Sequence, residues 1–88
     1  MKTKFLDGFL DVLGAIRDAE IRKRIAAVIE NVRSAESLSQ IYNLKKLKGA
    51  SSYFRIRTGD FKIGFRLEAG RIVFMRCLPR KDIYRSFP

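Results

Sequence analysis

The pattern of apolar positions divides the chain into a helical first half and a strand-forming second half. In the first half, apolar residues recur at helical spacing in two stripes with charged residues between them, which predicts two amphipathic helices. The first stripe is Leu6, Phe9, Leu10, Leu13 and Ile16, and the second is Ile21, Ile25, Val28, Ile29 and Val32. Asp18 precedes the second stripe, where its carboxylate is expected to cap the helix. Residues 3–5 are compatible with a short strand before the first helix.

After residue 52 the period of the pattern changes to two, which is typical of strands with one buried face. The runs 53–57, 61–67 and 71–78 are separated by the turn sequences "TGD" and "EAG", so they predict a three-stranded antiparallel meander. The preceding stretch, residues 34–52, has no sustained period and is expected to be a connection with one helical turn near residues 36–40.

The alternation also assigns faces to the strands. Residues Phe54, Ile56, Phe61, Ile63, Phe65 and Leu67 are expected on one face, together with Val73, Met75 and Cys77 of the third strand. The economical arrangement is a two-layer α+β sandwich with both helices packed on one face of a small, mainly antiparallel sheet. At 88 residues the whole chain, 1–88, is expected to be a single domain.

Charge is concentrated in the strand-forming half. The net charge is +10, but residues 1–44 hold seven Lys/Arg and six Asp/Glu, whereas residues 45–88 hold twelve Lys/Arg and three Asp/Glu. Such asymmetry indicates a polyanionic partner. The candidates are nucleic acid, an acidic protein segment and an anionic membrane surface. The face opposite the helices is expected to present Arg55, Arg57, Lys62, Arg66 and Arg76, with Tyr53 and Phe74 among them. Because neighbouring like charges repel one another, this face is interpreted as a binding surface.

Several classes of chemistry are disfavoured by composition. The chain has no histidine and one cysteine, Cys77, which removes histidine-assisted nucleophilic catalysis, an internal disulfide and most zinc sites. The second half has only three carboxylates, too few for a two-metal nuclease. We therefore expect no metal and no small-molecule cofactor. The single cysteine fits a reducing cytoplasm, the N-terminus has no signal-peptide or membrane-spanning stretch, and Cys77 is expected to be a small core residue.

Several motifs in the second half resemble a known family. Two helices followed by "KLKG", "YFRIRTGDFKIGF" and "RKDIYRSF" are similar to the RelE branch of the RelE/ParE superfamily, the toxins of type II toxin–antitoxin modules. The resemblance covers nearly the whole chain and is most specific between residues 43 and 86. It implies a cytoplasmic, ribosome-dependent mRNA endonuclease without metal, in which the 2′-hydroxyl attacks to leave a 2′,3′-cyclic phosphate and a 5′-hydroxyl. The implied partners are the ribosome, mRNA and a cognate antitoxin with an acidic or amphipathic segment.

The resemblance also implies roles for individual residues. Arg55 and Lys62 would stabilise the phosphate in the transition state, Arg80 (or Lys81) would protonate or stabilise the leaving oxygen, and Tyr84 would stack on the target base. Arg57 stands where the family often has a lysine thought to accept the 2′-hydroxyl proton, and arginine is a poor general base. Either Lys62 takes that proton, helped by neighbouring cations, or catalysis relies on electrostatics with a slower proton step.

The remaining basic residues and the alternatives complete the hypothesis. Residues expected to contact the RNA backbone are Lys45, Lys46, Lys48, Arg66, Arg76 and Lys81. Arg66 and Arg76 could instead be structural, and Tyr84 could merely close the edge of the core. The alternative functions are a ParE-like poison of DNA gyrase with the same fold and no RNase activity, or a degenerate member that only binds antitoxin or nucleic acid, for which Arg57 is the best argument.

Overall fold

The computed structural model describes residues 1–47 and 52–79 and has the expected α+β architecture. Along the chain the elements are β1 (Lys2–Phe5), α1 (Asp7–Ala15), α2 (Ala19–Ser34), the 3₁₀ turn η1 (Leu38–Gln40), β2 (Leu44–Lys46), β3 (Tyr53–Thr58), β4 (Phe61–Glu68) and β5 (Arg71–Pro79). The short first strand, both helices, the turn and the three-strand meander follow the sequence pattern. No described helix is long and apolar enough to span a bilayer.

The second helix begins where its capping residue predicts. The Asp18 Oδ1 accepts hydrogen bonds from the backbone N–H groups of Glu20 (2.9 Å) and Ile21 (3.2 Å). Two of the N–H groups that lack an intrahelical partner are thereby satisfied, and the carboxylate also suits the positive end of the helix. The side chains of Ile25 and Val32 from this helix are fully buried.

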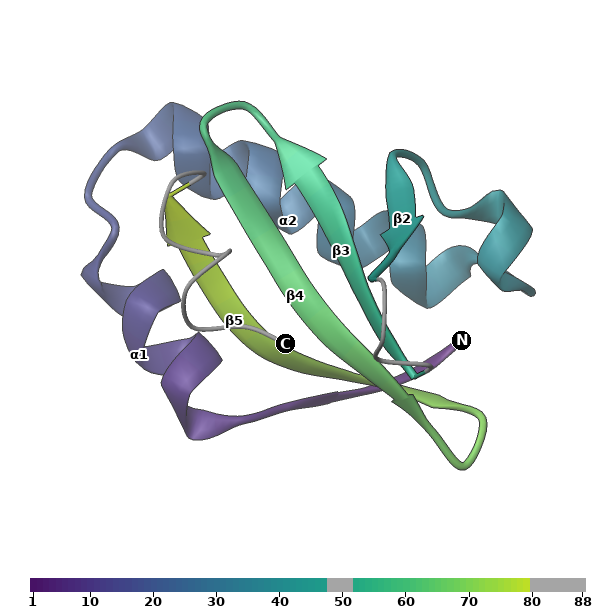
Figure 1. Cartoon of the computed structure of the whole chain (residues 1–88). Coiled ribbons are helices and arrows are strands. Elements are labelled where there is room, and N and C mark those ends of the chain that lie inside the picture. The colour runs from purple at the N-terminus through teal and green to yellow at the C-terminus, as the bar shows by residue number, and fades with distance from the viewer. Residues whose placement is uncertain (48–51, 80–88) are drawn as a thin grey trace.

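The five strands form one sheet in the order β1-β5-β4-β3-β2. Strand β1 pairs with β5 in parallel, and the other three pairs are antiparallel, so β1 and β2 are the two edges (Figure 1). The β3–β4 turn contains Gly59 at φ 58°, and the β4–β5 turn contains Ala69 at φ 50° and Gly70 at φ 75°. Positive φ at these positions is what tight hairpin turns require.

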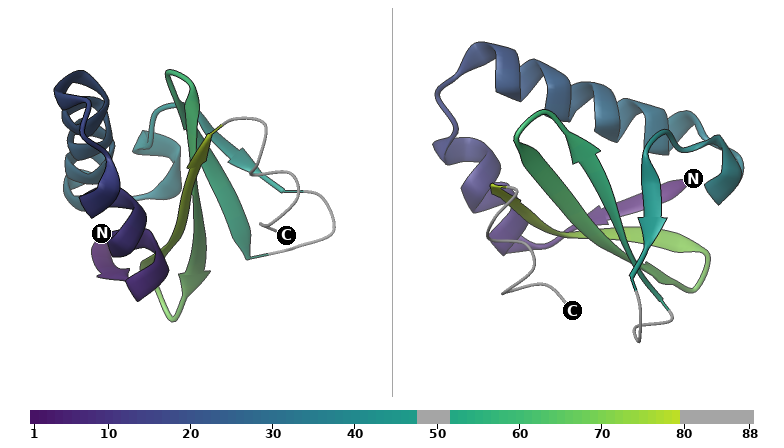
Figure 2. Two further views of the ribbon diagram at one scale, coloured as in Figure 1. Left: turned by 90° about the vertical axis from the view of Figure 1, so that its left-hand side faces the viewer. Right: turned by 45° about the horizontal axis from the view of Figure 1, so that its top comes forward.

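Both helices cover the same face of the sheet, which makes two layers (Figure 2). The core between the layers is rich in aromatic side chains. Phe74 is fully buried and its ring centroid lies 4.9 Å from Phe5, 5.3 Å from Phe9 and 6.1 Å from Phe65. Phe54 stacks on Phe65 at 5.4 Å. We call this helix-covered side of the sheet the inner face and the opposite side the outer face.

A β-bulge in β5 corrects the faces expected for that strand. Gly64 pairs with Arg76 whereas Phe65 pairs with Phe74, so Met75 is an extra residue with no partner in β4. The alternation therefore changes phase at Met75. The expectation that Ile72 and Phe74 face outward was wrong, and Val73 is buried, at 1% exposure, but on the outer face and not against the helices.

The actual faces of β5 follow from its pairing with β4. Ile72, Phe74 and Cys77 face the core, and Arg71, Val73, Arg76 and Leu78 lie on the outer face. Arg76 was expected there, and Cys77 is buried as expected. The run "RIVFM" is apolar without interruption after its arginine, so period two alone gave no sign of the bulge.

Strand β2 was not predicted, and the side chain of Asn31 in α2 holds the loop before it. The side chain of Asn31 donates to the Gln40 carbonyl (3.3 Å) and accepts from the backbone N–H of Tyr42 (3.1 Å). Asn43 then adopts a left-handed conformation at φ 60°, which asparagine tolerates well. The chain enters the sheet directly afterwards, with Leu44 opposite Ile56. Three residues are too few to show a period.

Candidate nucleic-acid interface

Strand register arranges the cations of the outer face in rows that cross the sheet. One row is Lys45, Arg55, Gly64 and Arg76, from β2 to β5. The next row toward the β3–β4 turn is Arg57, Lys62 and Leu78. The row on the opposite side of the first one is Tyr53, Arg66, Val73 and Lys4. Neighbouring strands are about 4.8 Å apart and residues two apart on one strand about 7 Å. Arg55, Arg57 and Lys62 are therefore immediate neighbours, as the site hypothesis requires.

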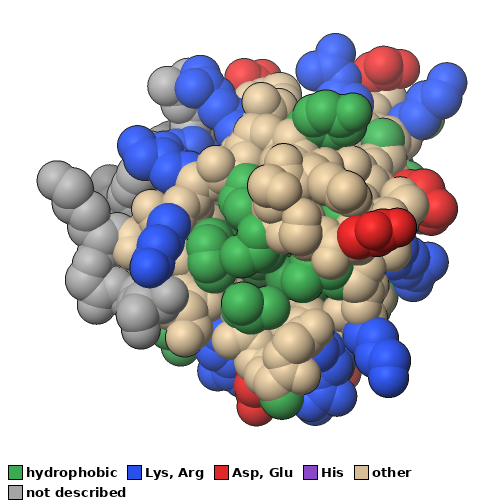
Figure 3. Space-filling model, turned by 90° about the vertical axis from the view of Figure 1, so that its right-hand side faces the viewer, with side chains coloured by type: hydrophobic (Ala, Val, Ile, Leu, Met, Phe, Trp, Pro, Cys, Tyr) green, Lys and Arg blue, Asp and Glu red, His purple; other side chains and the backbone are tan. Residues whose placement is uncertain are grey.

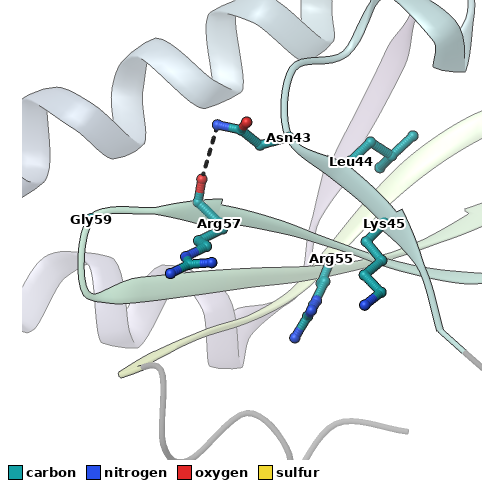
Figure 4. A pocket seen from close by; sticks show the side chains of 6 residues that line it. All are labelled: Asn43, Leu44, Lys45, Arg55, Arg57 and Gly59. Atoms are coloured by element: carbon teal, nitrogen blue, oxygen red, sulfur yellow. Dashed lines mark hydrogen bonds between the residues drawn. The ribbon is translucent and has the colours of Figure 1, made fainter.

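An open depression of about 720 Å³ lies between β2 and β3 on this side. Its described lining is Asn43, Leu44, Lys45, Arg55, Arg57 and Gly59. Figure 4 shows the side chains of Lys45, Arg55 and Arg57 projecting to the same side of the two strands, while the Asn43 amide donates to the Arg57 carbonyl (3.5 Å). None of these six residues is acidic. The depression therefore suits a phosphate group better than a cation or an apolar ligand.

Lys62 differs from the expectation that it is exposed to solvent. It pairs with Arg57 across β3 and β4, but only 1% of the residue is exposed. Arg57 is exposed, and Arg55 is half-buried. Lys62 and Arg55 both have interaction partners within the chain. A lysine is rarely buried to this extent, so Lys62 is a fixed part of the structure and not a mobile surface cation.

Arg66 is held by its neighbours at the other end of β4. Its Nη2 donates to Glu68 Oε2 at 2.7 Å, and hydrogen bonds with Tyr53 and then Glu68 raise the pKa of the guanidinium. The same pairing lowers the pKa of the Glu68 carboxyl, first through the hydrogen bond from Arg66 and then through the charges of Arg66, Arg71 and Lys4. Arg66 thus combines a structural role with its place on the outer face.

The other predicted contact residues are distributed more widely. Arg76 is exposed, and its guanidinium reaches the start of α1, where its Nη1 lies 3.4 Å from the position of a Cβ on Gly8. Lys46 is exposed but pairs with Phe54, so it does not share the outer face with Lys45. The remaining predicted residues, Lys48, Arg80, Lys81 and Tyr84, lie outside the described residues.

Three further residues adjoin the candidate site and were not expected from the sequence. Asn43 and Leu44 line the depression because β2 joins the sheet, and no periodic signal announced that strand. Arg24 comes from α2, yet its Nη1 lies only 3.0 Å from the position of a Cβ on Gly59. In the sequence Arg24 is one of three consecutive basic residues on the polar side of a helix, so nothing distinguished it.

The polar side chains that line the depression are cations and one amide, and the described residues as a whole offer little for metal or nucleophilic chemistry. They contain no group of three or more His, Cys, Asp or Glu side chains that could hold a metal ion. Burial raises the pKa of the Cys77 thiol to about 11, so this cysteine stays protonated at neutral pH and is a poor nucleophile. The outer face can therefore bind and stabilise negative charge, which favours a phosphodiester ligand.

Comparison with known proteins decides the family. A curated protein, Toxin RelE3 from Methanocaldococcus jannaschii, is 39% identical over 89 residues, which is all of this chain and all of that protein. The chain belongs to the RelE family of toxins. No family model matches the chain.

Solved structures give the same result for the fold. The RelE toxin fold described above resembles a chain in the RelB–RelE antitoxin–toxin complex from Methanococcus jannaschii, with a TM-score of 0.80, 39% identity and coverage of 97% of this chain and 99% of that one. A chain of an archaeal RelE–RelB complex from Pyrococcus horikoshii matches with a TM-score of 0.68 and 17% identity, and the match covers 90% of this chain and 93% of that one. A chain of the intact RelBE complex of E. coli matches with a TM-score of 0.67 and 11% identity, and the match covers 86% of this chain and 92% of that one.

Proposed function

We propose that this RelE toxin is a ribosome-dependent mRNA endonuclease of a type II toxin–antitoxin module. The observation that carries the proposal is the cluster of Arg55, Arg57 and Lys62 on adjacent strands beside a depression whose described lining has no acidic residue. Fixed guanidinium and ammonium groups stabilise the extra negative charge of a pentavalent phosphorane, and removing one such group typically costs about 10²–10³ in rate. The 2′-hydroxyl of the substrate serves as nucleophile, so the protein needs no nucleophile of its own.

The proposed division of labour starts from the fixed position of Lys62. Lys62 and Arg55 stabilise the phosphorane, with Arg57 binding a phosphate oxygen from the exposed side. Because arginine scarcely deprotonates, Lys62 is also the better candidate to accept the 2′-hydroxyl proton. Arg80 is proposed to assist the leaving 5′-oxygen and Tyr84 to stack on the target base. Glycine at position 64 leaves no side chain between Arg55 and Arg76, as befits a strand site that a ligand approaches closely.

The decisive experiment adds the purified protein to translating ribosomes in the presence of chelator and maps the mRNA ends. We expect cuts at the ribosomal A site that leave 2′,3′-cyclic phosphates. Arg55→Ala should reduce the cleavage rate by about a hundredfold or more. Lys23→Ala removes an exposed cation from α2 and is the matched control. Intact mRNA together with trapped DNA–gyrase complexes would instead establish the ParE-like alternative, for which the relatives named above give no support.

A second variant separates the two proton-transfer schemes. Arg57→Lys restores the residue common in the family at this position. If Lys62 accepts the proton, the pH profile of cleavage should be unchanged and the rate should stay within about threefold, because both residues bind phosphate as cations. A rate increase with a new basic limb in the pH profile would assign the proton transfer to position 57 and contradict the role of Lys62.

The proposed partner of the free toxin is an antitoxin with an acidic or amphipathic segment. Relatives have been solved as RelB–RelE complexes. On the side where β2 and the N-terminus lie, hydrophobic side chains gather near the centre of the surface, and Lys and Arg side chains lie around them, interspersed with Asp and Glu side chains (Figure 3). An amphipathic segment with acidic flanks complements such a surface. An antitoxin complex that leaves both this side and the outer face uncovered would disprove this inhibition scheme.

A further inference from the structure

A second group of cations lies on the outer face at the edge formed by β1. Lys2 pairs with Arg71 and Lys4 with Val73, while the intervening Thr3 pairs with the buried Ile72. Phe5 stacks on Phe74 in the core, which confirms that alternate residues of β1 point to the inner face. Lys2, Lys4 and Arg71 therefore share the outer face, and both lysines are exposed. We call these three residues the β1-edge strip.

Glu68 brings the strip and Arg66 together around one carboxylate. Three cations from three different strands, Arg66, Arg71 and Lys4, each lower the pKa of the Glu68 carboxyl. Only Arg66 is bonded to it, at 2.7 Å. Among the described residues the ion pairs are Arg66–Glu68 and Arg24–Glu20, so Lys2, Lys4 and Arg71 have no carboxylate partner there. One carboxylate beside four cations leaves a surplus of positive charge.

Protection of the sheet edge explains only part of this arrangement. Lysines on an edge strand prevent association with the edges of other sheets, which would account for Lys2 and Lys4. It does not account for Arg71, because β5 is an interior strand at this point and the Nε of Arg71 is buried without a hydrogen-bond partner. A buried Nε without a partner costs free energy through desolvation, while the half-buried Arg71 side chain as a whole can still meet a ligand. An anionic ligand would offset that cost.

The strip is separate from the candidate catalytic cluster. Glu68 and Lys62 are six residues apart on β4, which corresponds to about 20 Å. A nucleotide held beside Arg55 and Lys62 cannot also contact the strip, so an anion bound there belongs to another segment of RNA. Contacts from lysine and arginine to the backbone position a protein without reading sequence.

We propose that the β1-edge strip is a docking site for the phosphate backbone of folded RNA, used in addition to the candidate catalytic site. Glu68 holds Arg66 in place and limits how tightly the strip binds phosphate. The inference rests on the proposed RNA target but not on cleavage. In this arrangement the strip orients the toxin on a structured RNA surface while the depression receives the single strand that is to be cut.

The test compares two triple variants with the same change in net charge. Lys2→Glu, Lys4→Glu and Arg71→Gln alter the strip and keep a charged edge. Arg17→Gln, Arg22→Glu and Lys23→Glu alter exposed residues at and before α2 on the other layer. Binding to a short fluorescent RNA duplex is measured by anisotropy between about 50 and 200 mM salt.

We expect the strip variant to reduce the magnitude of the slope of log K against log salt by about two units. Each of the three lost phosphate contacts lowers that magnitude by roughly 0.7–0.9. The control variant should change the slope by less than half as much. Equal slopes for both triple variants would overturn the proposal. A strip variant that binds the duplex like the unaltered chain but self-associates in sedimentation would also overturn it, because the strip would then only protect the sheet edge. Tight binding to anionic lipid vesicles without binding to the duplex would overturn it as well.

A cleavage measurement distinguishes this proposal from the proposed function. At saturating toxin the strip variant should cut mRNA on ribosomes at the rate of the unaltered chain, while more protein is needed to reach saturation. Loss of rate at saturation would place the strip in the catalytic step and overturn a separate docking role. If the unaltered chain never cuts mRNA, the proposed function fails, and the salt slopes still decide whether the strip binds RNA.

Discussion

The two faces of the sheet are built from the same strands and have opposite energetic character. On the inner face, Phe54, Phe65 and Phe74 lie side by side and bury their rings against the helices. On the outer face the same strands carry Arg55, Arg57, Lys62 and Arg76, and the like charges of Arg57 and Lys62 lie directly opposite each other on adjacent strands. The inner face contributes stability through buried area, and the outer face gives up some stability to repulsion.

This difference shows why a small toxin can carry its chemistry on its sheet. Alternation directs successive side chains to opposite faces, so the phosphate-binding residues do not interrupt the core. Substitutions on the outer face should then change function with little effect on folding, and substitutions on the inner face should do the reverse. The following predictions test that separation, from the largest expected effect to the smallest.

Phe74→Ala should cause the largest loss of stability. The side chain is fully buried and contacts three other rings, and truncation of such a residue costs about 3–5 kcal/mol. Urea denaturation measures the effect, with Met75→Ala at the half-buried bulge as the control. If Phe74→Ala cost no more than the control, Phe74 would lie outward as simple alternation predicts, and the bulge would be misplaced.

Lys62→Met should separate function from stability most clearly. Methionine has a similar length and can fill the buried site, but it leaves the interaction partners of Lys62 without their cation. We expect only a modest fall in melting temperature, while mRNA cleavage falls by about a hundredfold. A large drop in melting temperature would show that Lys62 is chiefly a structural residue and would contradict its proposed role.

Asn31→Ala should loosen the β2 side of the depression. The substitution removes two hydrogen bonds to the loop before β2 and should cost about 1–2 kcal/mol. Hydrogen exchange of the backbone amides of Leu44–Lys46 should accelerate, because the loop no longer holds the edge strand in place. Ser39→Ala, on the exposed surface of the same loop, should leave exchange in β2 unchanged. Similar exchange in both variants would refute a positioning role for Asn31.

The Glu68 carboxyl should give the smallest effect, visible as a shift in titration. Its pKa lies below the ordinary value of 4.5 because of Arg66 and the nearby cations. A carboxyl whose pKa is lowered by folding stabilises the fold above its ordinary pKa, and this contribution is lost as the pH falls through the lowered value. Arg66→Met should move the midpoint, measured by NMR, back toward 4.5. An unchanged midpoint would show that Arg66 is not the main cause.

Much of the fold follows from the sequence because the signals are local. Asp18 caps α2 through its immediate neighbours, and Gly59 forms the β3–β4 turn that sets Arg57 opposite Lys62. Strand β2 depends instead on the hydrogen bond between Asn31 and Tyr42, which is eleven residues further along the chain, so no short window contains its signal. The bulge at Met75 lies in an apolar run whose phase is decided only by pairing with β4.

The candidate site shows the same division. Alternation predicted that Arg55, Arg57 and Lys62 share a face, and register places them together. The burial of Lys62 could not be predicted, because lysine in an alternating strand is ordinarily exposed. The hydrogen bond between Arg66 and Tyr53 could not be predicted either, because these residues are far apart in sequence and only the register of β3 and β4 places them opposite each other.

The bulge also determines where this chain can change length. Without Met75, Phe74, Arg76 and Cys77 would follow one another in regular alternation, each opposite the β4 residue with which it already pairs. Phe74 and Cys77 would stay in the core, and Arg76 would stay on the outer face. A one-codon deletion of Met75 should therefore cost much less stability than the loss of an aromatic ring from the core. Because a bulge bends its strand and increases the local twist, the main effect should be a straighter β5.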